Sequence, residues 1–197
     1  KSFHQAGDFD SAEPLYREIL DTSFHPHVAY LFGVLLNGGG RFTETIPVLE
    51  RAMGLNPDHE PTQCALARAY FWVNRVHDAE YLFLKILRRN GKNEEAALEL
   101  AKIYKDTRRW DDLIVLGYQA HGYHPQNLEL TGLLVHGLVM KDRHSEAVLL
   151  LVRNMVHYAE HRTAYDWLSR LFEKVPMPSN DLLSLFRRLT HPIGQQV

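Results

Sequence analysis

The stretch from Pro26 to His59, PHVAYLFGVLLNGGGRFTETIPVLERAMGLNPDH, decides the fold. Apolar residues recur at helical spacing until the run Gly38 to Gly40, which interrupts the pattern. A second helical pattern follows and stops before Pro57, because proline lacks a backbone N–H and disfavours helix in the residue before it. The stretch therefore predicts two helices joined by a short turn.

The same pattern recurs with a period of 34 residues, in units that begin at Pro26, Glu60, Glu94, Leu128 and Arg162. The eighth position of the units reads Gly33, Ala67, Ala101, Val135 and Ser169. The eleventh reads Leu36, Tyr70, Tyr104, Leu138 and Phe172. Small residues let two helices approach closely, and larger apolar residues fill the space between them. Each unit is therefore predicted to be one helix pair, with a first helix A and a second helix B.

Three residues depart from this pattern. Leu113 stands where a small residue is usual, Gly117 stands at an aromatic position, and Asn154 stands at a small-residue position. We expect weaker contacts between the helices at these three places, with no change in the fold.

The chain resembles the tetratricopeptide repeat (TPR) family. The unit from Pro26 to His59 carries the signature best, as Leu-Phe-Gly-x-x-Leu, then Gly-Arg-Phe, then Leu-x-x-Ala and finally Asn-Pro. One helix pair cannot bury its apolar face alone, so neighbouring pairs must stack. The resemblance implies an all-α, right-handed superhelical solenoid of antiparallel helix pairs.

The predicted array spans residues 1–175, with repeats at 1–25 (partial), 26–59, 60–93, 94–127, 128–161 and 162–175 (partial). A capping helix is predicted within 176–191, followed by a tail at 192–197. The predicted helices cover 9–22, 27–38, 42–54, 61–73, 76–89, 94–106, 110–121, 128–140, 144–157 and 162–174. The chain opens with Lys1 inside what looks like an incomplete helix, which suggests a trimmed fragment.

Composition excludes several classes of protein. Lys plus Arg is 22 and Asp plus Glu is 24 over 197 residues, so the formal net charge is −2 and general nucleic-acid binding is not expected. One cysteine excludes an intramolecular disulfide framework, and no apolar run is long enough to insert into a membrane. We expect a cytoplasmic protein, with periplasmic or membrane-anchored locations left open because the chain may be a fragment.

The resemblance implies that helices A line a concave groove that binds peptides or protein surfaces. At the ninth position of the repeats stand Arg68, Lys102, His136 and Arg170. Around them the resemblance places Tyr30, Phe71, Trp72 and Lys105. We expect these residues to contact an acidic or carboxylate-bearing partner. Binding of that partner should strengthen as the pH falls from about 7.5 to about 6, because His136 gains positive charge.

An alternative for the same cations is an ordinary solvated surface, in which Arg68 or Lys102 pairs with Asp106, Glu95 or Glu99. The aromatic residues point more clearly to a surface role, since Phe71 and Trp72 are adjacent and cannot both face one core. Trp110 is predicted to pack between repeats. Cys64 is predicted to be a buried or half-buried bystander, although Arg68 one helical turn away would lower its pKa.

Catalytic and metal-binding motifs are not convincing. His157-Tyr-Ala-Glu160-His161 matches a zinc-peptidase string, but it falls where one repeat gives way to the next, and Glu173 is the one suitable carboxylate after it. The triple glycine at Gly38 lacks the strand and the Lys-Ser/Thr of a phosphate-binding loop. We therefore expect no catalytic residue, no metal and no cofactor.

The sequence thus predicts a non-catalytic scaffold or adaptor that holds a protein or peptide segment in its groove. Two alternatives stay open. The chain could be the substrate-recognition module of a larger enzyme, such as a glycosyltransferase. It could also self-assemble as a homo-oligomer, because an uncapped N-terminal repeat would expose an apolar face that a second copy could cover.

Overall fold

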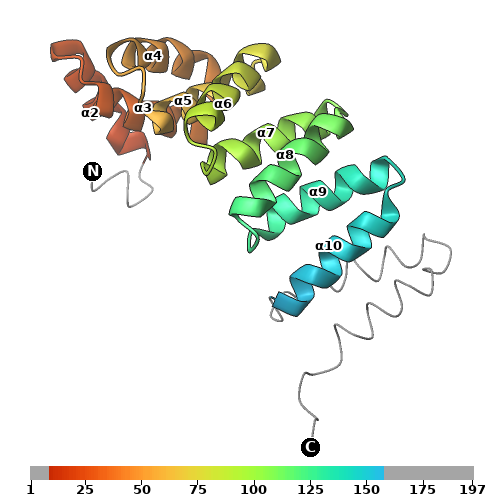
Figure 1. Ribbon diagram of the computed structural model, residues 1–197. Coiled ribbons are helices and arrows are strands. Elements are labelled where there is room, and N and C mark those ends of the chain that lie inside the picture. Colours follow the sequence, from red (N-terminus) through yellow and green to blue (C-terminus); the bar gives the residue numbers. More distant parts are fainter. Residues whose placement is uncertain (1–8, 158–197) are drawn as a thin grey trace, which may run out of the picture. The chain divides into compact units, whose positions relative to one another are not determined.

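A computed structural model describes residues 9–157, and the elements of this region are all α-helices (Figure 1). In chain order they are α2 (Phe9–Thr22), α3 (Pro26–Gly38), α4 (Phe42–Leu55), α5 (Glu60–Trp72), α6 (Val76–Arg89), α7 (Glu94–Asp106), α8 (Trp110–Tyr123), α9 (Leu128–Met140) and α10 (His144–His157). These bounds agree with the predicted ones to within two residues. The predicted helix at 162–174 and the capping helix lie outside the described residues.

The chain forms two compact units, and the division between them falls within α7. The N-terminal unit is Lys1–Ile103 and the C-terminal unit is Tyr104–Val197. In the N-terminal unit α3 packs on α2 and α4, and α5 packs on α3, α4 and α6. In the C-terminal unit α9 packs on α8 and α10. Each unit is therefore built from helices that pack on their neighbours in sequence, which is the arrangement predicted from the repeats.

The turn inside each helix pair has the same backbone conformation every 34 residues. The residue two positions before the start of the second helix has a positive φ, namely Gly40 (72°), Asn74 (65°), Arg108 (57°) and Asp142 (56°). The following N–H bonds to a carbonyl near the end of the preceding helix, as from Arg41 to Leu36 at 2.9 Å and from Arg75 to Tyr70 at 2.8 Å. Such left-handed turns satisfy carbonyl groups that a helix end leaves free.

An arginine directly after this turn pairs with an acid three residues later. The distances are 2.7 Å for Arg41–Glu44, 2.6 Å for Arg75–Asp78, 2.7 Å for Arg109–Asp112 and 2.6 Å for Arg143–Glu146. The acids stand in the first turns of their helices, where the helix dipole favours negative charge. The same arginine–acid pair thus lies at the N-terminus of α4, α6, α8 and α10.

The core follows the predicted spacing of small and large residues. Gly33 of α3 contacts Leu49 of α4, and both are buried. Large side chains that are fully buried include Leu36, Leu66, Phe83, Ile86, Leu100, Leu113, Leu134 and Leu151. The helices therefore pack at close range where glycine or alanine stands and are held apart by larger residues elsewhere.

The departures at residues 113 and 117 are accommodated by their neighbours, contrary to our expectation of weaker contacts. Leu113 is buried against Gly137, where an added Cβ would lie 3.2 Å from its Cδ2 atom. Gly117 faces Leu134, whose Cβ would lie 2.9 Å from a Cβ added to the glycine. Large and small residues have thus changed places across the α8–α9 contact, so its packing is retained.

Asn154 is the third departure and forms part of a buried polar contact. Its amide donates to the hydroxyl of Thr131 at 3.2 Å, and that hydroxyl donates to the carbonyl of Asn127 at 2.9 Å. A buried amide is expensive unless it is hydrogen-bonded. Thr131 therefore offsets the polarity that Asn154 brings to the α9–α10 contact.

Candidate functional site

Tyr30, Arg68 and Glu95 come together from three successive helices A of the N-terminal unit. Tyr30 lies on α3, Arg68 on α5 and Glu95 on α7. Arg68 Nη2 is 3.0 Å from Glu95 Oε1. Burial raises the pKa of Tyr30; the negative charge of Glu95 raises it further and the guanidinium of Arg68 opposes this. Two of the residues expected to contact a partner, Tyr30 and Arg68, thus lie close together, with Glu95 beside them.

Lys102 is paired in the same way. Its Nζ atom lies 3.1 Å from Oε1 of Glu99, three residues earlier on α7. The alternative that the chain's own carboxylates pair with these cations is therefore confirmed for Arg68 and for Lys102. Arg68 and Lys102 therefore each lie beside a negative side chain. The surface is not purely basic, as the residues at the ninth position of the repeats alone would suggest.

An exposed aromatic stack lies one turn from Arg68. The side chain of Trp72 is 64% exposed and its ring stacks on Phe42, with centroids 5.4 Å apart and an angle of 9° between the rings. Phe71 is half-buried and meets Trp72 edge-on at 6.0 Å. Residues four apart lie on one face of a helix, so Arg68 and Trp72 form a continuous surface of α5. At least one of the two adjacent aromatic residues is exposed, as predicted.

Cys64 lies on α5 but does not face solvent. It is 1% exposed, and burial raises the pKa of its thiol to about 12. Arg68 lowers that pKa, but by less than burial raises it. Cys64 is therefore buried, as predicted. The expected lowering of its pKa by Arg68 is present, but loss of hydration outweighs the charge of a partly exposed guanidinium.

Two of the predicted site residues that the structure describes belong to the C-terminal unit. His136 on α9 is exposed and meets Trp110 of α8 edge-on, with ring centroids 5.5 Å apart. Trp110 thus packs between one repeat and the next, as predicted. Lys105 at the end of α7 is 3.5 Å from Asp106. Arg170 and the string from Tyr158 to His161 lie outside the described residues, as does the start of the predicted uncapped repeat.

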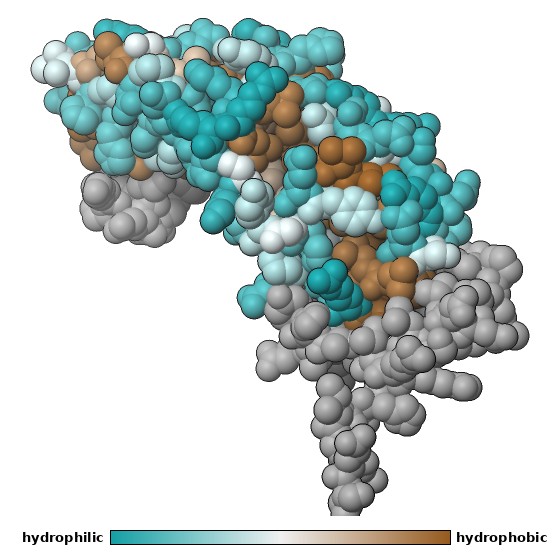
Figure 2. Space-filling view, viewed as in Figure 1, coloured by the Kyte–Doolittle hydropathy of each residue, from teal (hydrophilic) through white to brown (hydrophobic). Residues whose placement is uncertain are grey.

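Exposed apolar side chains occur in both units. Figure 2 shows one face of the molecule, largely hydrophilic, with smaller hydrophobic patches between the polar side chains. Tyr81, Val115 and Leu149 are exposed at equivalent positions of α6, α8 and α10. Sequence reasoning missed this recurrence, as it missed the arginine–acid pairs, although the 34-residue alignment contains both.

Within residues 9–157 no group of three or more His, Cys, Asp or Glu side chains is arranged to hold a metal ion. No helix of this region is long and apolar enough to cross a membrane.

These helix pairs, their recurring turns and their small–large contacts define the fold of TPR proteins. The chain is similar to a solved structure of MamA labelled AMB-1, with 22% identity, a TM-score of 0.66 and coverage of 81% of this chain and 87% of that one. A crystal structure of MamA has a TM-score of 0.72 at 17% identity, covering 82% of this chain and 90% of that one. TTC0263, a thermophilic TPR protein of Thermus thermophilus, has a TM-score of 0.62 at 14% identity, covering 87% of this chain and 94% of that one. No family model and no curated protein matches the chain.

Proposed function

We propose that this protein is a non-catalytic interaction module whose helices A bind an acidic or carboxylate-bearing segment of a partner protein. The observation that carries the proposal is the joint surface of Tyr30, Arg68 and Glu95, which three successive helices build. Stacked helix pairs of this kind offer extended surfaces for binding.

Arg68 is the residue on which a partner carboxylate would bind. Its side chain is 38% exposed and that of Glu95 is 48% exposed. Its Nε atom is buried and has no hydrogen-bond partner within the described residues. An exposed ion pair stabilises a protein by only about 0–1 kcal/mol. A partner carboxylate can therefore replace Glu95 at little cost, and the planar guanidinium favours two-point binding.

The stack of Trp72 on Phe42 supplies the apolar part of the same surface. Aromatic side chains that are exposed in the free protein and become buried on binding are frequent anchors of interfaces. Because Trp72 lies one turn beyond Arg68 on α5, one short segment with an acid and an apolar residue can contact both. Lys102, Lys105, Phe71, His136 and Arg170 remain proposed contacts of this kind.

A pull-down from the native source tests the proposal with matched variants. Arg68→Gln and Trp72→Ala should each lose a partner that the wild-type chain retains. Arg88→Gln is the control, because Arg88 is an exposed cation on α6, a helix B. Circular dichroism and thermal unfolding must show that all four chains are equally folded. Equal retention of the partner by Arg68→Gln and by the wild type would contradict the proposal.

A further inference from the structure

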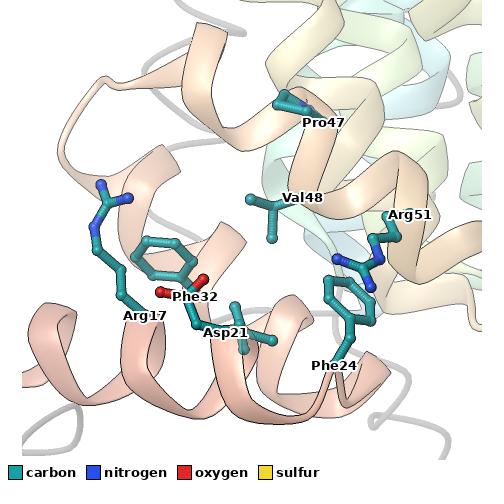
Figure 3. A pocket seen from close by; sticks show the side chains of 8 residues that line it. Arg17, Asp21, Phe24, Phe32, Pro47, Val48 and Arg51 are labelled. Atoms are coloured by element: carbon teal, nitrogen blue, oxygen red, sulfur yellow. The ribbon is translucent and has the colours of Figure 1, made fainter.

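A pocket of about 320 Å³ lies between α2, α3 and α4 of the N-terminal unit. Figure 3 shows side chains from all three helices around it. None of the residues that line it belongs to the surface proposed above, so the inference below does not depend on that surface. The volume lies at the lower end of the range for small-molecule pockets, roughly 300–1,000 Å³. It is large enough for one aromatic side chain and a small polar group.

Two walls of the pocket consist of an aromatic ring with a guanidinium over it. The guanidinium carbon of Arg51 is 3.9 Å from the ring centre of Phe24, and that of Arg17 is 5.2 Å from the ring centre of Phe32. Figure 3 shows Val48 pointing into the space between the two walls. Apolar side chains therefore form part of the lining, and guanidinium groups lie at two sides of the pocket.

The two arginines differ in whether their guanidinium groups are already ion-paired. Arg17 is bound to Glu13 at 2.8 Å and to Glu44 at 3.2 Å. Arg51 makes no ion pair or hydrogen bond with the residues that the structure describes. Its guanidinium lies over the ring of Phe24. A cation–π contact uses the face of the guanidinium and leaves its N–H edge available to an acceptor. Arg51 is thus the cation that can bind an added anion.

Asp21 also lines the pocket and sets a limit on the ligand. It forms no ion pair within the described residues, so its carboxylate is available to bind a cationic ligand. Such a ligand would, however, lie against two guanidinium groups, and these already cover the faces of Phe24 and Phe32 that a cation would use. The charges favour an anionic group placed at Arg51, on the side of the pocket away from Arg17.

We propose that this pocket binds the C-terminal aromatic residue of a partner chain. The ring lies between Phe24 and Phe32 against Val48, and the terminal carboxylate bonds to the N–H groups of Arg51. A C-terminal aromatic residue presents a ring and a carboxylate on the same residue, which matches a small apolar space with one free guanidinium at its edge. The pocket would give this module a second binding surface, built by α2, α3 and α4 and made of other residues than Arg68 and Trp72.

The test uses N-acetyl-L-phenylalanine as the probe and the 197-residue chain as the protein. Titration followed by NMR should shift the signals of Val48, Phe24 and Phe32 in a saturable way. N-acetyl-L-phenylalaninamide, which lacks the carboxylate, should bind at least about fivefold more weakly. Acetate, which lacks the ring, should leave the methyl signals of Val48 unchanged.

Variants separate the two charges. Arg51→Gln should weaken binding of the probe about fivefold or more, whereas Asp21→Asn should strengthen it about twofold because one repulsive charge is removed. Both side chains are exposed, so neither change should affect the fold. Arg88→Gln removes an equal charge from α6 and should not change the affinity.

Three results would overturn the inference. These are equal affinity for the acid and the amide, unchanged affinity in Arg51→Gln, and saturable shifts confined to residues outside the segment from the start of α2 to the end of α4. If Arg68→Gln loses a partner but still binds the probe with unchanged affinity, the result supports the function proposed above and does not contradict binding in this pocket.

Discussion

Gly33 and Leu49 are in contact so close that a Cβ atom added to the glycine would lie 2.4 Å from Cδ2 of Leu49. Leu49 is fully buried, so it cannot turn into solvent to make room. The contact joins α3 to α4 and sets how closely the two helices of this repeat approach.

Gly33→Ala should therefore destabilise the protein by about 1–3 kcal/mol, which is the usual cost of overpacking a core. Gly54→Ala is the matched control, because Gly54 lies in α4 with no atom within 4 Å of an added Cβ. That change should stabilise the protein by about 0.5–1 kcal/mol, since alanine loses less backbone entropy in a helix. Urea denaturation measures both. Equal effects of the two substitutions would show that α3 and α4 separate easily.

The recurring turn predicts two changes of opposite sign. Gly40→Ala should lower the stability by about 1 kcal/mol, because an L-residue is strained at a positive φ. Arg108→Gly should raise it by about 0.5 kcal/mol, as relief of strain exceeds the added entropy of the unfolded chain. Thermal unfolding compares them with the wild type. A loss of stability in Arg108→Gly would mean that its side chain has a role beyond the turn.

The start of α4 should respond to acid. Hydrogen bonds from Arg41, and then from Arg17, lower the pKa of Glu44 to about 2, and Arg41 is also the first cause of the lowered pKa of Glu13. A carboxylate with a lowered pKa in the folded state stabilises the protein above its unfolded pKa of about 4.3. That stability is lost as the pH falls through the folded value.

Denaturation of the wild type should therefore become easier between about pH 5 and about pH 2, and Glu44→Gln should show a shallower dependence on pH. Glu18→Gln serves as the comparison, since Glu18 is an exposed residue of α2 outside this cluster. Identical pH profiles for Glu44→Gln and the wild type would show that the ion pairs of Glu44 do not contribute to folding.

Cys64 should be unreactive in the folded protein. Its thiol is buried and its pKa is raised to about 12, so almost none of it is thiolate at neutral pH. Labelling with a thiol-specific chromogenic reagent at about pH 8 should be slow in buffer and rapid in urea. Rapid labelling without denaturant would indicate that α5 opens locally.

The sequence left two interpretations of Arg68 and Lys102 open, contact with a partner or pairing with the chain's own carboxylates, and the structure shows the pairing. Arg68 and Lys102 could be placed on helices A from their position in the repeat, because residues at one repeat position lie on equivalent faces. The pairing of Arg68 with Glu95 joins two helices and depends on side-chain directions that the repeat pattern does not contain, whereas Lys102 and Glu99 lie three residues apart on one helix. The balance between burial and charge at Cys64 likewise depends on the neighbouring helices, and there burial outweighs the nearby charge.

The 34-residue spacing was sufficient to predict the helix pairs and the places where their turns lie. Turns and helix ends depend on glycine, proline and apolar spacing, which are local properties of the chain. Tertiary structure alone decided which side chains meet across helices: Leu113 with Gly137, Leu134 with Gly117, and the pocket that Phe24 and Arg51 share. These contacts join residues up to 27 positions apart in the chain, and they depend on how packed helices fill space at close range.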